Sequence, residues 1–179
     1  MNDPEPMLSH VFVLGLNADE TEYEVIGKVG DIAPDESIWS ARFIGDKAYI
    51  VTFRNIDPLW TIDLSEPTNP RIIGELKIPG VSTYIHPVGD THLLTIGIAG
   101  DDEGLDWGVT QISFFDVSDF SNPILESELK LNPAPNGENG WSYSHSEATY
   151  EHKAFQYWES DGLLAIPLST SRWFENSVI

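Results

Sequence analysis

The chain has 179 residues, with 9 basic side chains (Lys and Arg) against 29 acidic ones, so its formal net charge is −20. This charge excludes a nucleic-acid binder that acts by neutralising phosphates, and it argues against docking on an anionic membrane surface. The chain has no cysteine, which excludes disulfides and thiolate chemistry, while 41% hydrophobic and 11% aromatic residues are enough to form a buried core.

Short β-branched and aromatic runs, separated by turn residues, follow one another along the chain and predict strands. The first two are His10–Leu16 and Tyr23–Val29. Eight more follow, at Ser40–Ile44, Ala48–Phe53, Leu59–Leu64, Arg71–Ile78, Ser82–Val88, His92–Ile98, Gln111–Val117 and Pro123–Leu131. The last two are Glu151–Trp158 and Leu163–Leu168, joined by an Asp161-Gly162 turn. Connections this short leave no room for crossover helices, so we expect antiparallel pairing.

One turn occurs twice in the sequence. Asp63-Leu-Ser-Glu-Pro-Thr-Asn-Pro70 has the same order of residue types as Asp116-Val-Ser-Asp-Phe-Ser-Asn-Pro123, 53 positions on. Asp side chains accept hydrogen bonds from nearby backbone amides in such turns, and proline prevents the strand from continuing. We therefore predict equivalent structural positions for Asp63 and Asp116. A repeat of four short strands at this period is typical of β-propeller blades.

The sequence thus predicts an all-β fold, a β-propeller fragment made of four-stranded antiparallel blades. In this interpretation residues 1–179 are part of one propeller domain. It has a blade remnant at 8–30, full blades at 38–80 and 81–131, and a partial blade at 145–170. Closed propellers need about four blades or more. We therefore expect open edges near Val11–Leu16 and Leu163–Leu168, which are liable to self-association.

A family resemblance rests on the order and spacing of many short segments between Tyr23 and Leu168. They are Ser40-Ala-Arg-Phe43, Gly45-Asp-Lys-Ala-Tyr-Ile-Val-Thr-Phe53, Asp57-Pro-Leu59, Ile62-Asp-Leu-Ser65, Gly74-Glu-Leu-Lys-Ile-Pro-Gly80, Ser82-Thr-Tyr-Ile-His-Pro87, Phe115-Asp-Val-Ser-Asp119, Tyr143-Ser144, Ser146-Glu-Ala148, His152-Lys-Ala-Phe155 and Leu163-Leu-Ala-Ile-Pro167. Together they resemble the secreted bacterial and archaeal proteins with a C-terminal β-propeller domain, distantly related to WD-repeat propellers.

The resemblance implies a secreted, periplasmic or cell-surface protein of uncharacterised role, and it brings no catalytic residues with it. Localisation rests on the resemblance, because the acidic, proline-rich Met1–Met7 is unlike an export signal. No apolar run approaches the roughly 18 residues of a membrane span, so no transmembrane segment is predicted.

The densest carboxylate cluster is Asp101, Asp102, Glu103 and Asp106, flanked by glycines that permit a sharp bend. Such a cluster predicts Ca²⁺ as a candidate ligand, the only cofactor suggested. A solvated acidic loop is the competing interpretation, and we favour it. His145, Glu147 and Glu151 would share one face if their segment were extended. Since their spacing matches no established metal motif, we interpret them as a polar connection.

Three tryptophans, Trp39, Trp60 and Trp158, lie on or beside predicted strands, which favours packing roles. Trp107, Trp141 and Trp173 lie in predicted loops and are better placed for ligand contact. The long connections Ala99–Val109 and Asn132–Tyr150 should emerge on the same propeller face. Candidate ligand-binding residues there are Trp107, Trp141 and Glu138, with a glycan or a basic protein as the expected partner.

No Gly-x-Ser-x-Gly, Walker or Gly-x-Gly-x-x-Gly motif occurs. The sequence therefore favours a non-catalytic binding or scaffolding propeller over an enzyme. The alternative is an enzyme with a site on the face of the long connections, completed by blades that this chain lacks. Arg42 and His86 fall on innermost predicted strands, where polar residues that line the central channel are ordinary.

Overall fold

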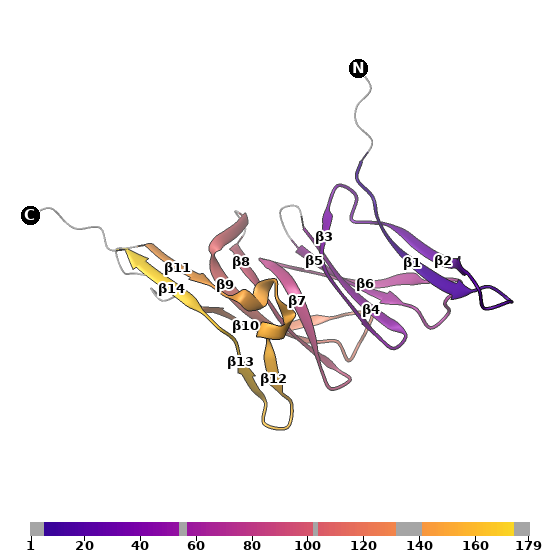
Figure 1. The fold of residues 1–179 in the computed structure, drawn as a ribbon. Helices are drawn as coiled ribbons and strands as arrows, with labels where there is room; N and C mark the ends of the chain where they lie inside the picture. The colour runs from indigo at the N-terminus through magenta and orange to yellow at the C-terminus, as the bar shows by residue number, and fades with distance from the viewer. Residues whose placement is uncertain (1–5, 54–56, 102–103, 132–140, 174–179) are drawn as a thin grey trace, which may run out of the picture.

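The chain forms a series of antiparallel sheets that lie next to one another in chain order (Figure 1). The structure, a computed structural model, describes residues 6–53, 57–101, 104–131 and 141–173. The first complete sheet contains β3 (Ser37–Ile44), β4 (Lys47–Phe53), β5 (Asp57–Asp63) and β6 (Arg71–Ile78), in that order. The second contains β7 (Val81–Val88), β8 (His92–Asp101), β9 (Gly104–Asp116) and β10 (Ile124–Leu131), again as a meander. These sheets confirm the prediction of an all-β propeller fragment with two full four-stranded blades.

A two-stranded sheet of β1 (Ser9–Leu16) and β2 (Tyr23–Ile32) precedes them. After them, two pairs form: β11 (Trp141–His145) with β14 (Ser169–Trp173), and β12 (Gln156–Trp158) with β13 (Leu163–Ala165). The strands β13 and β14 follow each other closely along the chain, and β13 pairs with β12 while β14 pairs with β11. We therefore treat the two pairs together as the last sheet.

The inner strand of the last sheet is therefore split, which corrects the prediction of one strand over Glu151–Trp158. Between its halves lie two short 3-10 helices, η1 (Glu147–Thr149) and η2 (His152–Ala154). Ser146 and Glu151 cap them, accepting hydrogen bonds from the backbone amides of Ala148 and Lys153. The predicted irregular connection before Tyr150 thus contains a strand, β11. No helix within the described ranges is long and apolar enough to cross a membrane.

The core consists of seams between neighbouring sheets. In the seam between the two full blades, Tyr49 and Leu59 pack with Ile85, Leu93 and Phe115, all at most 2% exposed. A second seam joins β1–β2 to the first full blade, and a third joins the second full blade to the last sheet. Each blade therefore buries its faces against its neighbours, which fixes the relative positions of the loops at the ends of the strands.

The repeated turn has the predicted geometry in both blades. The Ser65 amide donates to Asp63 Oδ1 at 2.9 Å, and the Ser118 amide donates to Asp116 Oδ1 at 2.7 Å. These bonds from Ser65 and Ser118 are the largest causes that hold the pKa of Asp63 and of Asp116 below the usual range. The equivalence predicted from the repeat is thus confirmed.

We expect Asp63→Ala to lower the melting temperature by a few degrees near neutral pH, because the Ser65 amide loses its acceptor. A lowered pKa in the folded state means that the stabilisation is present above the unfolded pKa and is lost as the pH falls through the folded pKa. The difference from wild type should therefore shrink in acid. Thermal melts across pH, with Asp90→Ala as a turn-carboxylate control, test this. An equal loss in the control, or a loss that persists in acid, would contradict the assignment.

Candidate functional site

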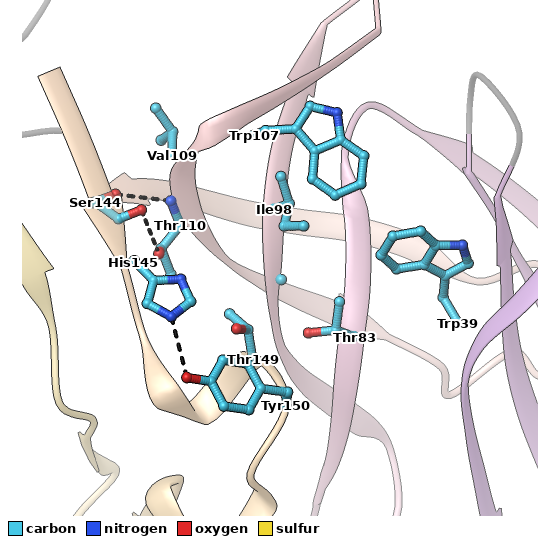
Figure 2. Close-up of a pocket in the computed structure, with 11 residues that line it drawn as sticks. Trp39, Thr83, Ile98, Trp107, Val109, Thr110, Ser144, His145, Thr149 and Tyr150 are labelled. Atoms are coloured by element: carbon cyan, nitrogen blue, oxygen red, sulfur yellow. Dashed lines mark hydrogen bonds between the residues drawn. The ribbon is translucent and has the colours of Figure 1, made fainter.

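A cavity of about 280 Å³ lies where the two full blades meet the last sheet (Figure 2). Its aromatic walls are Trp39 from β3, Trp107 from β9, and Tyr150, which follows η1. The remaining lining residues come from β7, β8, β9, β11 and η1: Thr83, Gly97, Ile98, Val109, Thr110, Ser144, His145 and Thr149. Three sheets thus contribute to one hollow, as is common for small-molecule sites.

Trp107 reaches this cavity because β9 bulges. Ile98 pairs with Thr110, but the next residue of β8, Ala99, pairs with Asp106, so residues 107–109 have no partners on β8. The Asp106 carboxylate supports the bulge by accepting a 3.1 Å hydrogen bond from the Gly108 amide. The Trp107 ring, 61% exposed, lies beside Trp39 with ring centroids 5.8 Å apart.

Three hydroxyl groups of the cavity, all from threonines, donate their protons to backbone carbonyls. Thr83 donates to the Ile96 carbonyl at 3.2 Å, and Thr110 donates to the Ser144 carbonyl at 3.2 Å. Thr149 donates to the Ser146 carbonyl at 2.7 Å. Each hydroxyl then offers only oxygen lone pairs to a guest, so the polar part of this cavity is suited to ligands that donate hydrogen bonds.

A row of rings forms the side of the cavity at β11. The His145 ring stacks on Tyr150 with centroids 5.6 Å apart, and its Nε2 lies 3.4 Å from the Tyr150 hydroxyl (Figure 2). A hydrogen bond with Glu147 is the largest of the causes that raise the pKa of the Tyr150 hydroxyl. The Tyr150 ring is therefore neutral and adjoins a carboxylate, an arrangement that favours positively charged or hydrogen-donating groups.

Two residues of the acidic cluster lie on paired strands rather than in an irregular loop. Asp101 is the last residue of β8 and pairs with Gly104, while Asp106 lies on β9 and supports the bulge. The prediction of a loop over Ala99–Val109 is therefore wrong, because the strand ladder continues almost to its tip. Asp102, Glu103 and Glu138 lie outside the described residues. Ca²⁺ binding by the cluster stays a prediction.

The aromatic predictions have mixed outcomes. Trp107 lines the cavity but lies on β9, and the backbones of Trp141 and Trp173 pair in β11 and β14, so the prediction of loops for these three residues is wrong. Trp39 packs against the seam of the two full blades, as expected, but it also lines the cavity, which the sequence analysis missed. His145 and Tyr150 were missed as well, because the split strand and the 3-10 turn that position them have no counterpart in the repeat.

Two other groups behave as ordinary structural residues. The extended face proposed for His145, Glu147 and Glu151 does not form, because Glu147 begins a 3-10 helix. His86 lies among rings at the third seam, with Phe155 and Tyr157 centroids both at 5.4 Å. Burial first, and then the charge of Arg42, lower the pKa of His86. We therefore assign His86 a packing role, as a neutral ring between two sheets.

Comparison with known proteins agrees with the blade architecture. The family model described as "Beta propeller domain" matches residues 2–178. An uncharacterised protein of Methanocaldococcus jannaschii is 44% identical over 128 residues, which cover 72% of this chain and 19% of that protein. An uncharacterised protein of Archaeoglobus fulgidus is 34% identical over 150 residues, covering 72% of this chain and 23% of that protein. The chain thus spans about a fifth of the length of these relatives, and it belongs to the β-propeller domain family.

Proposed function

We propose that this propeller chain is a binding module whose ligand occupies the cavity between Trp39, Trp107 and Tyr150. The observation that carries the proposal is the combination of aromatic walls with hydroxyl groups whose protons are already bonded elsewhere. A guest must then present an apolar face to the rings and hydrogen-bond donors to the oxygens. A single sugar ring has both properties, and it is the ligand class that we propose.

The size of the cavity supports a small guest. Its volume of about 280 Å³ is near the lower end for small-molecule pockets, so it suits one ring or one chain end rather than a polymer segment. Trp107 is exposed at the cavity, so the entry is aromatic as well. An organic ammonium group is the second candidate, favoured by the contact of Glu147 with Tyr150 and by the net charge of −20.

Two parts of the proposal reach beyond the cavity. Trp141 is the first residue of β11 and Glu138 precedes it in the sequence, and we include both as further ligand contacts. The family resemblance also leads us to propose that the protein acts outside the cytoplasm. The alternative is an enzyme whose site on this face is completed by blades outside this chain, and clustered acid, base or metal-binding residues on the same face of those blades would favour it.

Trp107→Ala and Trp39→Ala should each weaken ligand binding by on the order of tenfold, because each removes one aromatic wall. Monosaccharides and small ammonium compounds can be screened by tryptophan fluorescence, and affinities can then be measured by calorimetry. Trp158→Ala is the matched control, since this tryptophan is 45% exposed and does not line the cavity.

Sugars that bind wild type but neither cavity variant would support the proposal. Binding of ammonium compounds alone would replace the ligand class and keep the site. If a ligand is found and both cavity variants bind it as wild type does, or Trp158→Ala loses as much, the cavity is not the site.

A further inference from the structure

Three potential metal ligands meet at the opposite end of the second full blade. They are His92 at the start of β8, Asp116 at the end of β9 and Glu126 on β10. One ligand atom from each lies within 4.8 Å of the other two, and His92 Nε2 is 3.6 Å from a Glu126 carboxylate oxygen. The strand register explains the meeting, because His92 is directly opposite Asp116 and Glu126 falls at a bulge in β10.

Two of the three ligands are held in place before any ion arrives. His92 Nδ1 is 2.9 Å from the Thr91 hydroxyl, and its ring stacks on Phe114 with centroids 4.9 Å apart and planes 6° apart. Such a bond at one ring nitrogen orients the other nitrogen, as the outer-shell partners of metal-binding histidines do. Asp116 is held in place by the Ser118 amide, which donates to its Oδ1 at 2.7 Å.

The first full blade provides an internal comparison at the same place. There Lys47 is opposite Asp63, and Arg71 Nη2 lies 3.0 Å from Asp63 Oδ2. Arg71 therefore pairs with this carboxylate, while Lys47 places its Nζ over the Phe120 ring, 5.2 Å from the ring centroid. The second blade has His92 in place of Lys47 and Ile124 in place of Arg71, and Glu126 adds a second carboxylate.

The cation that the first blade supplies is thus absent from the second. In the described part of the chain, neither Asp116 nor Glu126 pairs with a lysine or an arginine. Two carboxylates beside one imidazole repel each other unless a positive charge lies between them. The replacement of both basic residues therefore points to an external cation rather than to a weakened ion pair.

We propose that His92, Asp116 and Glu126 bind a divalent transition-metal ion, for which Zn²⁺ is the probe. An imidazole with two carboxylates suits such ions, whereas Ca²⁺ prefers oxygen ligands alone. The Glu126 side chain is 44% exposed, so solvent rather than packed neighbours surrounds much of it and leaves it room to turn toward an ion.

The ion would connect three neighbouring strands of one blade close to their ends. Because it binds the folded chain at residues that are far apart in the sequence, Zn²⁺ should raise the melting temperature, and the rise should grow with the logarithm of the Zn²⁺ concentration above the dissociation constant. The site is at the other end of the strands from the aromatic cavity, so its ligand and its test are independent of the proposed function.

Zn²⁺ titration of the 179-residue protein, by calorimetry and by competition with a chromophoric chelator, tests the proposal. We expect one strong site in wild type, at least tenfold weaker binding in His92→Gln and in Glu126→Gln, and loss of the Zn²⁺-dependent rise in melting temperature. Glu128→Gln removes the same charge two residues further along β10, and His145→Gln removes a histidine of the aromatic cavity. Both controls should bind as wild type does.

All four substitutions are at side chains that are not buried, so we expect the variants to fold. Circular dichroism and thermal melts without metal check this. Absence of a strong site in wild type would overturn the proposal. Equal weakening in Glu128→Gln would do the same, because it would show that Zn²⁺ responds only to the overall acidity. Stronger binding of Ca²⁺ than of Zn²⁺ would also overturn it, since His92 would then have no part.

Discussion

Gly74→Ala should destabilise the chain by roughly 1–3 kcal/mol, which is the usual cost of forcing an extra carbon into a filled space. A Cβ at Gly74 would lie 2.5 Å from Thr61 Oγ1 and 2.8 Å from the Ser121 carbonyl oxygen. Thr61 is fully buried and donates a 2.7 Å hydrogen bond to the Phe120 carbonyl. The turn that begins at Asp116 is therefore seated on the outer strand of the preceding blade, and alanine would displace it.

The same contact between a glycine of an outer strand and the turn of the next blade occurs one blade earlier. A Cβ at Gly27 on β2 would collide with the carbonyl oxygen of Pro67, the residue that corresponds to Phe120 in the other copy of the turn. The outer strands of consecutive sheets thus use glycine to admit the backbone of the next blade's turn. Ser127 stands at the corresponding position of β10, where it is exposed.

Urea unfolding followed by circular dichroism measures the effect, and Ser127→Ala is the matched control. The control should leave stability nearly unchanged, because Ser127 already has a Cβ. Gly74→Ala with the midpoint of wild type would show that the turn is not seated on β6 as described.

The repeated turn explains why the blades could be predicted from the sequence. Each copy keeps the Asp that binds its own backbone and the proline that ends the turn, and these local features need no knowledge of the distant chain. The last sheet could not be predicted in the same way, since the caps Ser146 and Glu151 divide its inner strand. Hydrophobic alternation gives no signal for a strand interrupted by two short helical turns.

The candidate sites were harder to predict for a different reason. Trp39 and Trp107 lie on different blades and meet only because β9 bulges over residues 107–109, a feature that depends on pairing with β8. Aligning the two blades strand by strand does place His92 against Lys47 and Ile124 against Arg71. The sequence therefore contains the replacement of two basic residues by His92 and Ile124. Only the strand register shows that the Glu126 side chain lies close to His92 and Asp116.

The open face of β1–β2 leads us to expect that the 179-residue chain self-associates. Five apolar side chains point away from the first full blade, and each is at least half exposed: Phe12, Leu14, Leu16, Tyr23 and Val25. In the described residues β1 pairs with β2 alone, so its other edge offers unpaired backbone groups. An apolar face beside an open edge is what a further blade, or a second copy of the chain, would cover.

Sedimentation velocity over a concentration series should show a reversible shift to dimers or larger species. Leu14→Lys combined with Val25→Glu should weaken the association by at least about tenfold, since burying one such side chain stabilises by roughly 1.5–3 kcal/mol. Leu14 and Val25 are directly opposite each other on β1 and β2, so the new charges can pair and preserve the hairpin. Leu129→Lys, which changes an exposed leucine on the outer strand β10, is the control and should associate as wild type does.

A monomer at every concentration would contradict the expectation. Equal weakening by Leu129→Lys would show that association depends on the net charge and the total exposed apolar surface of the chain rather than on the β1–β2 face. If the double variant alone becomes monomeric and keeps its melting temperature, the chain self-associates through the β1–β2 face. The second copy must then present an apolar surface of its own, because five exposed apolar side chains are stabilised by burial only against apolar groups.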